Sequence, residues 1–345
     1  MTNHRVLIVG DSRKMKGGVS TVIKTMENSY LWHKYQCRWL ECQINASKWM
    51  KVLYLLRGMF LALFVVPRYQ IIHFHTTPGK SIRVQLGIFV YALMWRKHII
   101  LHLHVGNQLM HAQNDKIFAF CCQKADAIVT LGEVWRQYVP VADKSKVHVI
   151  YNPAPIVSTP CVPQKYFLFA AYLDIICKAY DVLIKGWAVV ARTHPDWKLV
   201  VCGAGEVDNL MRLIREEGVE TSVDFRGWAE GEQKKQLFEH AYGYIMTSVL
   251  EGLPMSILES LAMGVPVVTT PVGSLPEILE NGKNALIFDF NDAQGMAECV
   301  IRLIDENTLR RHLVDGGQQL AEGRLSVNCF VNQVNELYLS LVNEK

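Results

Sequence analysis

Short apolar runs, each followed by a turn and then by a stretch with helical spacing, recur along this 345-residue chain. Such alternation indicates βαβ units, whose strands form parallel sheets with helices on both faces. A proline-rich segment, 152–163, separates two sets of runs. The first set is 6–9, 71–75, 99–104, 127–131 and 147–151, and the second is 166–170, 197–202, 223–225, 244–247, 267–269 and 286–288. We therefore predict an α/β protein with two Rossmann-like domains whose parallel sheets face a central cleft.

The length of the chain agrees with two domains, because single domains usually have about 100–200 residues. Half of the residues are hydrophobic, which is enough to form substantial cores. We place the first domain at 1–155, the second at 164–328 and a terminal helix at 329–345. That helix carries Phe330, Val334, Leu337 and Leu341 at helical spacing.

The cysteines indicate a reduced, cytosolic protein. There are nine of them, they are scattered, and no two are spaced as Cys-x2-Cys. The adjacent Cys121 and Cys122 do not match the spacing of zinc ligands. We expect core thiols rather than disulfides or a metal site. The apolar run at 6–10 is too short for a signal peptide, so we expect none.

The charge is unevenly distributed along the chain. Residues 1–155 contain 20 Lys and Arg against 7 Asp and Glu, or +13, and the remainder has 16 against 25, or −9, which sums to +4. A basic first half predicts an anionic partner, such as a membrane surface, a lipid diphosphate or a nucleic acid. Because no recognition motif accompanies the charge, we expect no nucleic-acid partner.

One apolar segment, 49–66, favours the membrane. Lys48, Lys51, Arg57 and Arg68 lie in and around it, and the apolar stretches on either side of Arg57 are too short to span a bilayer. An interfacial helix fits the segment, and so does an ordinary buried helix of a Rossmann layer. The first alternative predicts a cytoplasmic protein that binds the inner face of the plasma membrane peripherally.

The segment 248–259 is the most informative about function. Glu251 and Glu259 bracket seven residues that begin Gly-Leu-Pro, and a turn and a strand with glycines at 264 and 273 follow. If a helix starts near Pro254, Glu251 lies in the loop before it and Glu259 lies in its second turn. Both carboxylates are then within reach of one ligand.

The same segment predicts an anion site. Gly252 lets backbone approach a ligand closely, and Pro254 suits the first turn of a helix. The free N–H groups near Met255 and Ser256 would face the anion at the positive end of the helix dipole. Two carboxylates around a diphosphate-sized site fit a nucleotide sugar, one for the ribose diol and the other for sugar hydroxyls.

This segment resembles the Glu-x7-Glu signature of retaining nucleotide-sugar glycosyltransferases, glycosyltransferase family 4, which have the GT-B fold of two Rossmann-like domains. In that family the terminal helix crosses back onto the first domain. Gly17 and Gly18 resemble the loop in which backbone approaches the donor phosphates. The strand end at 101–106 resembles the family's strand that finishes in His-Gly, where the histidine borders the donor sugar and the acceptor. This makes His104 the candidate for that histidine. His102 lies two residues earlier, on the same side of the strand.

In the second half, Lys178 begins a Lys-Ala-Tyr-Asp segment that resembles the family's Lys-Gly-x-Asp, whose lysine contacts the diphosphate. Tyr172 stands where the family has an arginine for the phosphate. We consider Arg13, Lys14 or Lys16 as a substitute cation. Two further glycine-containing strand ends resemble donor-binding segments, and the residues that they contribute are Gly203, Arg226 and Gly227.

The resemblance implies a retaining hexosyltransferase that uses neither metal nor cofactor, since no Asp-x-Asp motif is present. It implies that the acceptor oxygen attacks the anomeric carbon on the same face from which the diphosphate leaves. The departing phosphate accepts the proton of the acceptor. The basic first half suggests a glycan or lipid-linked saccharide acceptor in surface polysaccharide or lipopolysaccharide biosynthesis. The implied catalytic residues are His104, Lys178 and Glu251. The implied donor-binding residues are Gly17, Gly18, Lys178, Gly203, Arg226, Gly227, Glu251, Gly252, Leu253, Pro254, Met255 and Glu259.

Two other functions are compatible with the sequence. Tyr172 is compatible with a non-catalytic relative that binds a nucleotide sugar as a scaffold. Another two-domain enzyme, such as a nucleotide-sugar epimerase or a phosphorylase, would share the cleft.

Overall fold

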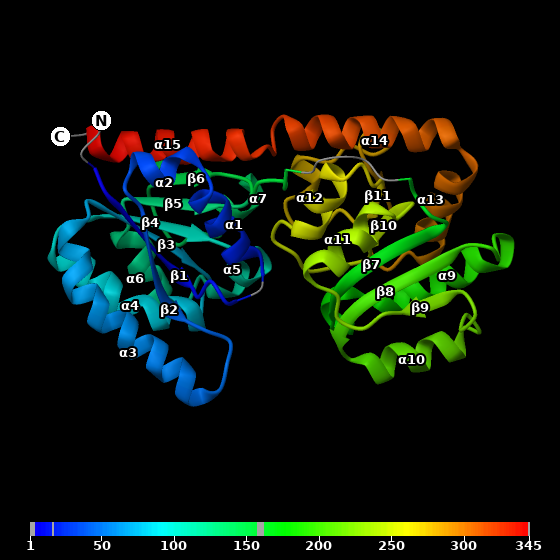
Figure 1. The fold of residues 1–345 in the computed structure, drawn as a ribbon, viewed down its shortest axis with the longest axis horizontal. Helices are drawn as coiled ribbons and strands as arrows, with labels where there is room; N and C mark the ends of the chain where they lie inside the picture. The colour runs from blue at the N-terminus through cyan, green and yellow to red at the C-terminus, as the bar shows by residue number, and fades with distance from the viewer. Residues whose placement is uncertain (1–3, 16, 157–161, 344–345) are drawn as a thin grey trace. The chain divides into compact units, whose positions relative to one another are not determined.

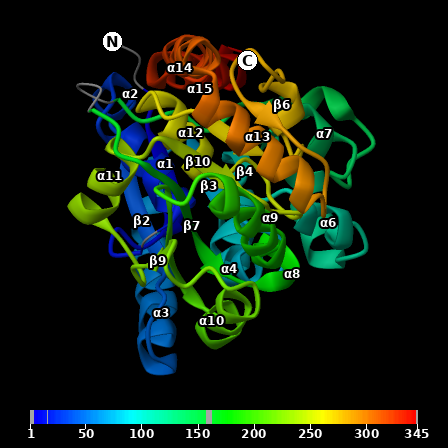
Figure 2. The same cartoon turned by 90° about the vertical axis from the view of Figure 1, so that its right-hand side faces the viewer.

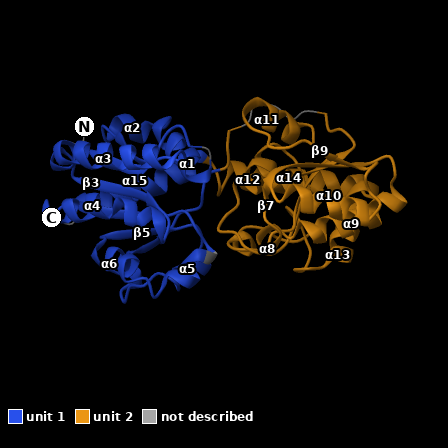
Figure 3. Ribbon diagram, turned by 90° about the horizontal axis from the view of Figure 1, so that it is seen from below, with its two compact units in different colours: residues 1–153, 327–345 blue, residues 154–326 orange. Residues whose placement is uncertain are grey.

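The computed structural model describes residues 4–15, 17–156 and 162–343. The chain forms two compact units, coloured separately in Figure 3. Unit 1 is Met1–Pro153 with Val327–Lys345, and unit 2 is Ala154–Ser326. The boundaries expected from the sequence run close to this division. Part of the proline-rich segment, 157–161, lies outside the described residues.

Unit 1 contains a six-stranded parallel sheet with the order β2-β1-β3-β4-β5-β6 (Figure 1). Its strands are β1 (Val6–Asp11), β2 (Arg38–Gln43), β3 (Ile71–Thr76), β4 (His98–Leu103), β5 (Ala127–Thr130) and β6 (Val147–Val149). The sequence analysis missed β2. It is an edge strand in which Arg38 and Glu41 interrupt the apolar residues, so it lacks the continuous apolar run of an inner strand.

Helices connect these strands and cover both faces of the sheet. They are α1 (Gly18–Glu27), α2 (Tyr30–Lys34), α3 (Lys48–Val65), η1 (Val66–Arg68), α4 (Lys80–Met94), α5 (Asn107–Ala112), α6 (Lys116–Lys124), α7 (Glu133–Arg136), η2 (Lys144–Lys146) and α15 (Val327–Asn343). The terminal helix α15 belongs to this unit because its apolar side chains pack into one core with β1, β3 and α1. The Tyr35 hydroxyl also donates to Asn335 Oδ1 over 2.9 Å.

The helix expected at 49–66 is present as α3. Most of its large apolar side chains are exposed, so the alternative of an ordinary buried Rossmann-layer helix is wrong.

Unit 2 contains a second six-stranded parallel sheet with the order β12-β11-β10-β7-β8-β9. Its strands are β7 (Tyr166–Leu173), β8 (Lys198–Gly205), β9 (Val223–Phe225), β10 (Gly243–Met246), β11 (Val267–Thr269) and β12 (Leu286–Ile287). Its helices are α8 (Ile175–Lys178), α9 (Tyr180–Thr193), α10 (Val207–Glu216), α11 (Gly231–Glu239), α12 (Met255–Ala262), η3 (Leu275–Glu277), α13 (Ala293–Asp305) and α14 (Asn307–Glu322).

One face of this sheet packs on α9 and α13, which lie side by side (Figure 2). Gly186 of α9 allows their close approach, because a Cβ there would lie 2.6 Å from the carbonyl oxygen of Ala293. Trp187 fills the centre of this core, and its indole N–H donates to Ser222 Oγ over 3.1 Å. The predicted fold class, α/β with two Rossmann-like domains, is confirmed.

Each sheet contains a topological switch point, where the strands on either side connect in opposite directions. In unit 1 the switch lies between β1 and β3, and in unit 2 it lies between β7 and β10. Ligands of open parallel sheets bind beyond the carboxyl ends of strands at such points. These two strand pairs therefore show where to look for a site in each unit.

Candidate active site

The switch point of unit 2 holds an ion pair between Lys178 and Glu251. Lys178 follows β7 and Glu251 follows β10, so the two residues come from the strands that flank the switch. About one fifth of each side chain is exposed, 21% for Lys178 and 17% for Glu251. The pair is thus sheltered but remains accessible to a ligand.

Several hydrogen bonds fix the position of Lys178. Asp174 caps the short helix α8, accepting the N–H groups of Ile176 over 3.0 Å and of Cys177 over 3.1 Å. The Thr247 hydroxyl, just beyond β10, donates to the carbonyl oxygen of Lys178 over 2.7 Å. The lysine turn is therefore attached to the carboxyl ends of both strands.

Ala179 has a left-handed backbone conformation, with φ 44° and ψ 46°. Non-glycine residues pay about 1 kcal/mol or more for this region. The family pattern that the segment resembles has glycine at this position, which adopts the conformation without strain. This chain forms the same turn, which presents Lys178, although position 179 is alanine.

The loop that carries Glu251 is held by a close backbone approach. The Ser274 N–H donates to the carbonyl oxygen of Gly252 over 3.0 Å. A Cβ at Gly273, whose φ is +62°, would lie 2.5 Å from that same oxygen. Only glycine fits there, which explains the glycine that follows the Glu-x7-Glu segment.

The helix after this loop, α12, begins at Met255, one residue after the predicted start. Pro254 is its N-cap and provides no side-chain hydrogen bond, and no acidic residue lies in the first turn. The N–H groups at this helix start are thus uncapped by side chains, as an anion site requires. Leu253 is buried beneath the loop and anchors it.

Glu259 lies in the second turn of α12, as the sequence predicted, and forms an ion pair with Lys234 of α11 over 2.6 Å. Each glutamate of the motif is therefore paired with a lysine from another element. The sequence analysis missed Lys234, because α11 resembles any charged surface helix and only the tertiary structure brings it to α12.

A cavity of about 110 Å³ lies beside this second ion pair. Its lining residues are Leu168, Ala170, Ala171, Cys202, Trp228, Ala229, Lys234, Leu237 and Phe238. Apolar side chains dominate, with one cation at the edge and one indole that is half exposed. A cavity of this composition fits a planar ring that stacks on Trp228, another residue that the sequence analysis did not select.

The structure does not place two of the predicted residues in this group. Arg226 forms an ion pair with Asp224 over 2.6 Å and lines a separate cavity with Tyr166 and Lys198, because β9 is an edge strand. A Cβ at Gly203 would lie 2.4 Å from the carbonyl oxygen of Ala171, so close strand packing explains this glycine without a ligand.

Gly227 has a φ of +66°, and its carbonyl oxygen accepts the N–H of Gly203 over 2.8 Å. It turns the chain between Arg226 and Trp228. Tyr172, at the end of β7, is 61% exposed. The residue that replaces the expected arginine therefore faces solvent and carries no positive charge.

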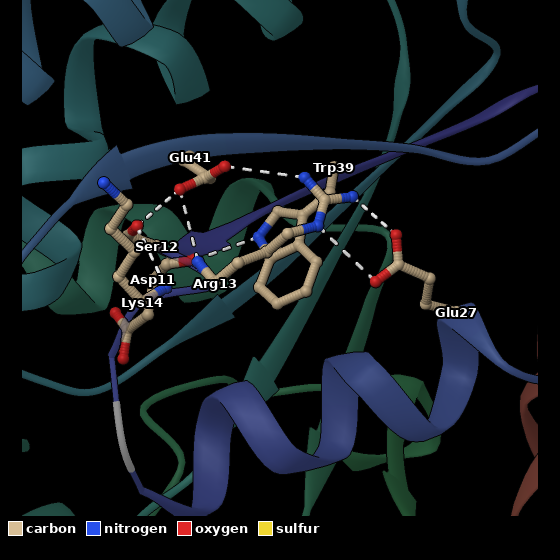
Figure 4. A network of polar contacts seen from close by, with 7 residues as sticks. All are labelled: Asp11, Ser12, Arg13, Lys14, Glu27, Trp39 and Glu41. Carbon is tan, nitrogen blue, oxygen red and sulfur yellow. Dashed lines mark hydrogen bonds and ion pairs between the residues drawn. The ribbon is translucent and has the colours of Figure 1, made fainter.

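In unit 1, Arg13 was one candidate to replace that arginine, but carboxylates already hold it (Figure 4). Its guanidinium pairs with Glu27 over 2.5 Å and with Glu41 over 3.5 Å, and lies 4.6 Å from the centre of the Trp39 ring. The Ser12 hydroxyl also donates to Glu41 over 2.5 Å. Arg13 is thus part of a network that fixes the loop after β1.

Lys14 is exposed in that loop, and Lys16 lies outside the described residues. The loop ends at Gly17, which has a φ of 147° and is the N-cap of α1. Gly18 begins the helix, and α1 has no side-chain cap and no acid in its first turn. This second uncapped helix start lies at the switch point of unit 1.

Four histidines follow one another along β3 and β4 and just beyond β4, on the strand that flanks this switch point and on its neighbour. His75 pairs in register with His102, and their rings stack with centroids 4.8 Å apart. His104 lies next to them, with its Nε2 2.8 Å from His75 Nδ1. His73 Nδ1 lies 2.7 Å from the Tyr338 hydroxyl of α15. His104 is therefore the last member of a histidine column, and it alone is partly exposed.

Burial lowers the pKa of His73 to about 3 and lowers the pKa values of His75 and His102 well below 6.5, and the neighbouring imidazoles lower them further. The column is therefore neutral at physiological pH. Candidate ligand nitrogens of these three residues lie within 4.8 Å of one another. The ring of His102 stacks on those of His73 and His75, and the rings of His73 and His75 are tilted by 32° to each other.

Comparisons with known proteins relate the chain to glycosyltransferases. Residues 161–320 match the family model described as "Glycosyl transferases group 1". The match lies almost wholly within unit 2, so it is unit 2 that resembles this family.

The chain is similar to the lipopolysaccharide core biosynthesis glycosyltransferase LpsE of Rhizobium meliloti, with 32% identity over 169 residues, 49% of this chain and 47% of that protein. It is also similar to the lipopolysaccharide 1,6-galactosyltransferase of Salmonella typhimurium, with 25% identity over 225 residues and 62% of each chain. The chain thus spans about half to two thirds of the length of these curated relatives.

Among solved structures, Anabaena Alr3699/HepE in complex with UDP and glucose has a TM-score of 0.78, with 17% identity over 98% of this chain and 100% of that chain. This likeness shows the fold alone, the GT-B architecture of two Rossmann-like domains. The family domain and the named relatives support the prediction that the protein is a glycosyltransferase enzyme.

We expect the histidine column to make unit 1 sensitive to acid. Above pH 6.5 these imidazoles are neutral in both the folded and the unfolded chain. Below it the unfolded chain binds protons that the buried column does not bind, so the free energy of unfolding falls by up to about 1.4 kcal/mol per pH unit per histidine. Urea unfolding of unit 1 between pH 8 and pH 5 measures this loss.

Replacing His102 by leucine should make that loss shallower, because neither of its ring nitrogens has a hydrogen-bond partner among the described residues and only the titration is removed. His111→Leu, at an exposed position of α5, is the matched control and should leave the profile unchanged. Identical pH profiles for His102→Leu and the unsubstituted protein would contradict this account.

Proposed function

We propose that this protein transfers a hexose from a nucleoside-diphosphate sugar to a saccharide acceptor, with retention of the anomeric configuration, as in glycosyltransferase family 4. The observation that carries the proposal is the Lys178–Glu251 pair beside the uncapped start of α12, at the switch point of the unit that matches the glycosyltransferase family model. This arrangement offers a cation, a helix dipole and a carboxylate to a single diphosphate sugar.

The donor is proposed to bind to unit 2 in three parts. The diphosphate lies at the start of α12, next to the backbone of Gly252, Pro254 and Met255. Lys178 leaves its ion pair with Glu251 and contacts the diphosphate. Glu259 receives the ribose hydroxyls in place of its contact with Lys234. The base occupies the apolar cavity and stacks on Trp228, as its size and composition favour.

The proposed reaction breaks the bond between the anomeric carbon and the β-phosphate oxygen, and forms a bond from that carbon to an acceptor oxygen on the same face. The acceptor's proton passes to the departing phosphate oxygen. Negative charge builds on the diphosphate as the bond breaks, and Lys178 and the α12 amides stabilise it electrostatically. In this proposal Glu251 binds the transferred sugar, and His104 borders the sugar and the acceptor.

Gly17 and Gly18 are proposed to bring the uncapped start of α1 to the donor phosphates. The acceptor is proposed to be a glycan or lipid-linked saccharide in lipopolysaccharide or surface polysaccharide biosynthesis. Relatives named for lipopolysaccharide biosynthesis support this class of acceptor, and so does the basic charge of the first half of the chain.

Nucleoside-diphosphate binding tests the donor site directly. Lys178→Ala and Glu259→Ala should each weaken binding of uridine, guanosine or adenosine diphosphate by up to about 3 kcal/mol, the scale of a charge-assisted contact. Isothermal titration calorimetry measures the loss. Lys283→Ala removes a lysine that pairs with Glu280 on the surface, and serves as the control that should bind normally. Unchanged affinity in both site variants would refute the donor site.

Glu251→Gln distinguishes an enzyme from a scaffold. Because the proposed contact is to the transferred sugar, the substitution should reduce turnover of a nucleotide-sugar donor at least tenfold and should change the affinity for free nucleoside diphosphate much less. Donor hydrolysis and transfer assays, run beside calorimetry, measure both. Full activity in this variant would contradict the catalytic role of Glu251. A protein that binds donors and never turns them over would support the scaffold.

Transfer should survive chelation of divalent cations, because the proposed charge stabilisation comes from Lys178 and backbone amides. The measurement is the transfer rate in excess EDTA, compared with the rate after magnesium or manganese is added back. A loss of transfer that either metal restores would contradict the metal-independent mechanism.

A further inference from the structure

The helix α3 turns its small residues toward the sheet. Gly58, Ala62 and Val65 are its buried positions, one turn apart along one face. A Cβ at Gly58 would lie 3.2 Å from the Cα of Cys42, so the backbone of α3 lies almost directly on β2. This contact leaves no space for large side chains on the inner face.

The large apolar side chains of α3 therefore point outward. They are Trp49, Met50, Val52, Leu53, Leu56, Met59, Phe60, Leu63 and Phe64, and between 39% and 85% of each is exposed. A surface helix of a soluble protein usually shows the opposite arrangement, with a polar outer face. Figures 1 and 2 show α3 on the outer side of its unit, where no other described element of unit 1 covers it.

The exposed apolar face continues onto α4. The Tyr91 hydroxyl donates to the carbonyl oxygen of Leu63 over 3.1 Å, which joins the two helices. Beyond that contact Val90, Met94 and Trp95 are exposed at the end of α4. Contiguous exposed apolar surface of this extent marks an interaction site rather than ordinary surface.

The charge around this face has a single sign. No Asp or Glu occurs between Glu41 and Asp115. Cations border the apolar residues of α3 and the end of α4, namely Lys48, Lys51, Arg57, Arg68, Arg96 and Lys97. Among the described residues none of these six forms an ion pair. An apolar face rimmed only by cations is complementary to a surface that is apolar inside and anionic at its edge.

We propose that the outer face of α3, with the end of α4, binds the anionic surface of a lipid bilayer. The helix lies in the interface, the apolar side chains enter the boundary between headgroups and acyl chains, and the cations contact lipid phosphates. Trp49 sits at headgroup depth, where indoles are favoured.

The helical segment 48–68 is long and apolar enough to cross a membrane by length and composition, and an 18-residue window within it has a mean hydropathy of 1.8. The connections of α3 exclude this arrangement. The helix joins β2 to β3, and both strands pair with β1 in one sheet. A crossing helix would place these two neighbours of β1 on opposite sides of the bilayer.

A second copy of the chain fits this face less well than a bilayer does. In a two-fold dimer the same patch lies on both sides of the interface, so cations at the rim of this face would approach cations of the other copy. With no acidic residue on the face to compensate, the contact would be repulsive. The phosphates of a bilayer supply the missing negative charge.

The test is sedimentation with vesicles of phosphatidylethanolamine and phosphatidylglycerol at a 3:1 ratio, beside vesicles of phosphatidylcholine alone. The full chain should bind the anionic vesicles and should bind more weakly as salt rises, since salt screens the phosphate contacts. Leu56→Ser with Phe60→Ser should reduce binding about tenfold or more, because each removes apolar surface that enters the bilayer. Phe290→Ser, an exposed apolar residue of unit 2, is the matched control.

A charge variant tests the second part of the proposal. Replacing Lys48, Lys51 and Arg57 by glutamine should remove the preference for anionic vesicles, at about fivefold per cation. Replacing the exposed Arg192, Arg215 and Lys283 of unit 2 changes the net charge equally and should have no such effect.

Circular dichroism of each variant checks that the fold is kept. Equal binding of the Leu56/Phe60 variant and the unsubstituted protein would overturn the proposal. Salt-independent binding to both vesicle types would overturn the role of the cations. A dimer in solution that the Leu56/Phe60 variant abolishes, without any vesicle binding, would assign the face to a second copy instead. None of these measurements depends on glycosyl transfer, so the proposed function can fail while this inference stands.

Discussion

The parallel pairing of β7 with β10 is the constraint on which the candidate active site depends. These strands are separated by about 70 residues in the sequence, and their pairing brings the turn after β7 next to the loop after β10. Lys178 and Glu251 meet only because of this register. The hydrogen bond from Thr247 to the carbonyl oxygen of Lys178 shows the same dependence, since it joins the two segments directly.

The site is built from ion pairs whose two partners can each bind a different group of one ligand. In the Lys178–Glu251 pair and in the Lys234–Glu259 pair, one positive charge balances one negative charge. A diphosphate sugar offers anionic oxygens to the lysines and hydroxyl groups to the glutamates. The partial burial of these side chains makes such contacts stronger than they would be at the surface. In the proposed donor complex, Tyr172 contributes no positive charge, so Lys178 and Lys234 would balance a larger share of the phosphate charge.

The close contact between α3 and β2 determines which side chains of α3 are exposed. Gly58 allows the helix backbone to contact β2, which excludes large residues from the inner face. The apolar side chains that the sequence shows between 49 and 64 must then lie outside. From the sequence alone this segment fitted both a buried and an interfacial helix, because its hydrophobicity is high on all sides and its periodicity selects neither.

The sequence by itself determined the two sets of strands, the α/β class and the Glu-x7-Glu segment with its helix start, because these depend on local periodicity, glycine and proline. It did not determine β2, whose mixed composition reflects an edge position, nor Lys234, which reaches the site from a helix with no local signal. Trp228 directly follows the strand end from which the sequence selected Arg226 and Gly227, but only the tertiary structure places its indole at the cavity. The sequence also suggested Arg226 and Gly203 from glycine-containing strand ends, where the tertiary structure shows an edge ion pair and close strand packing. Which side chains share a site was decided by strand order and register, because those fix distances between residues far apart in the chain.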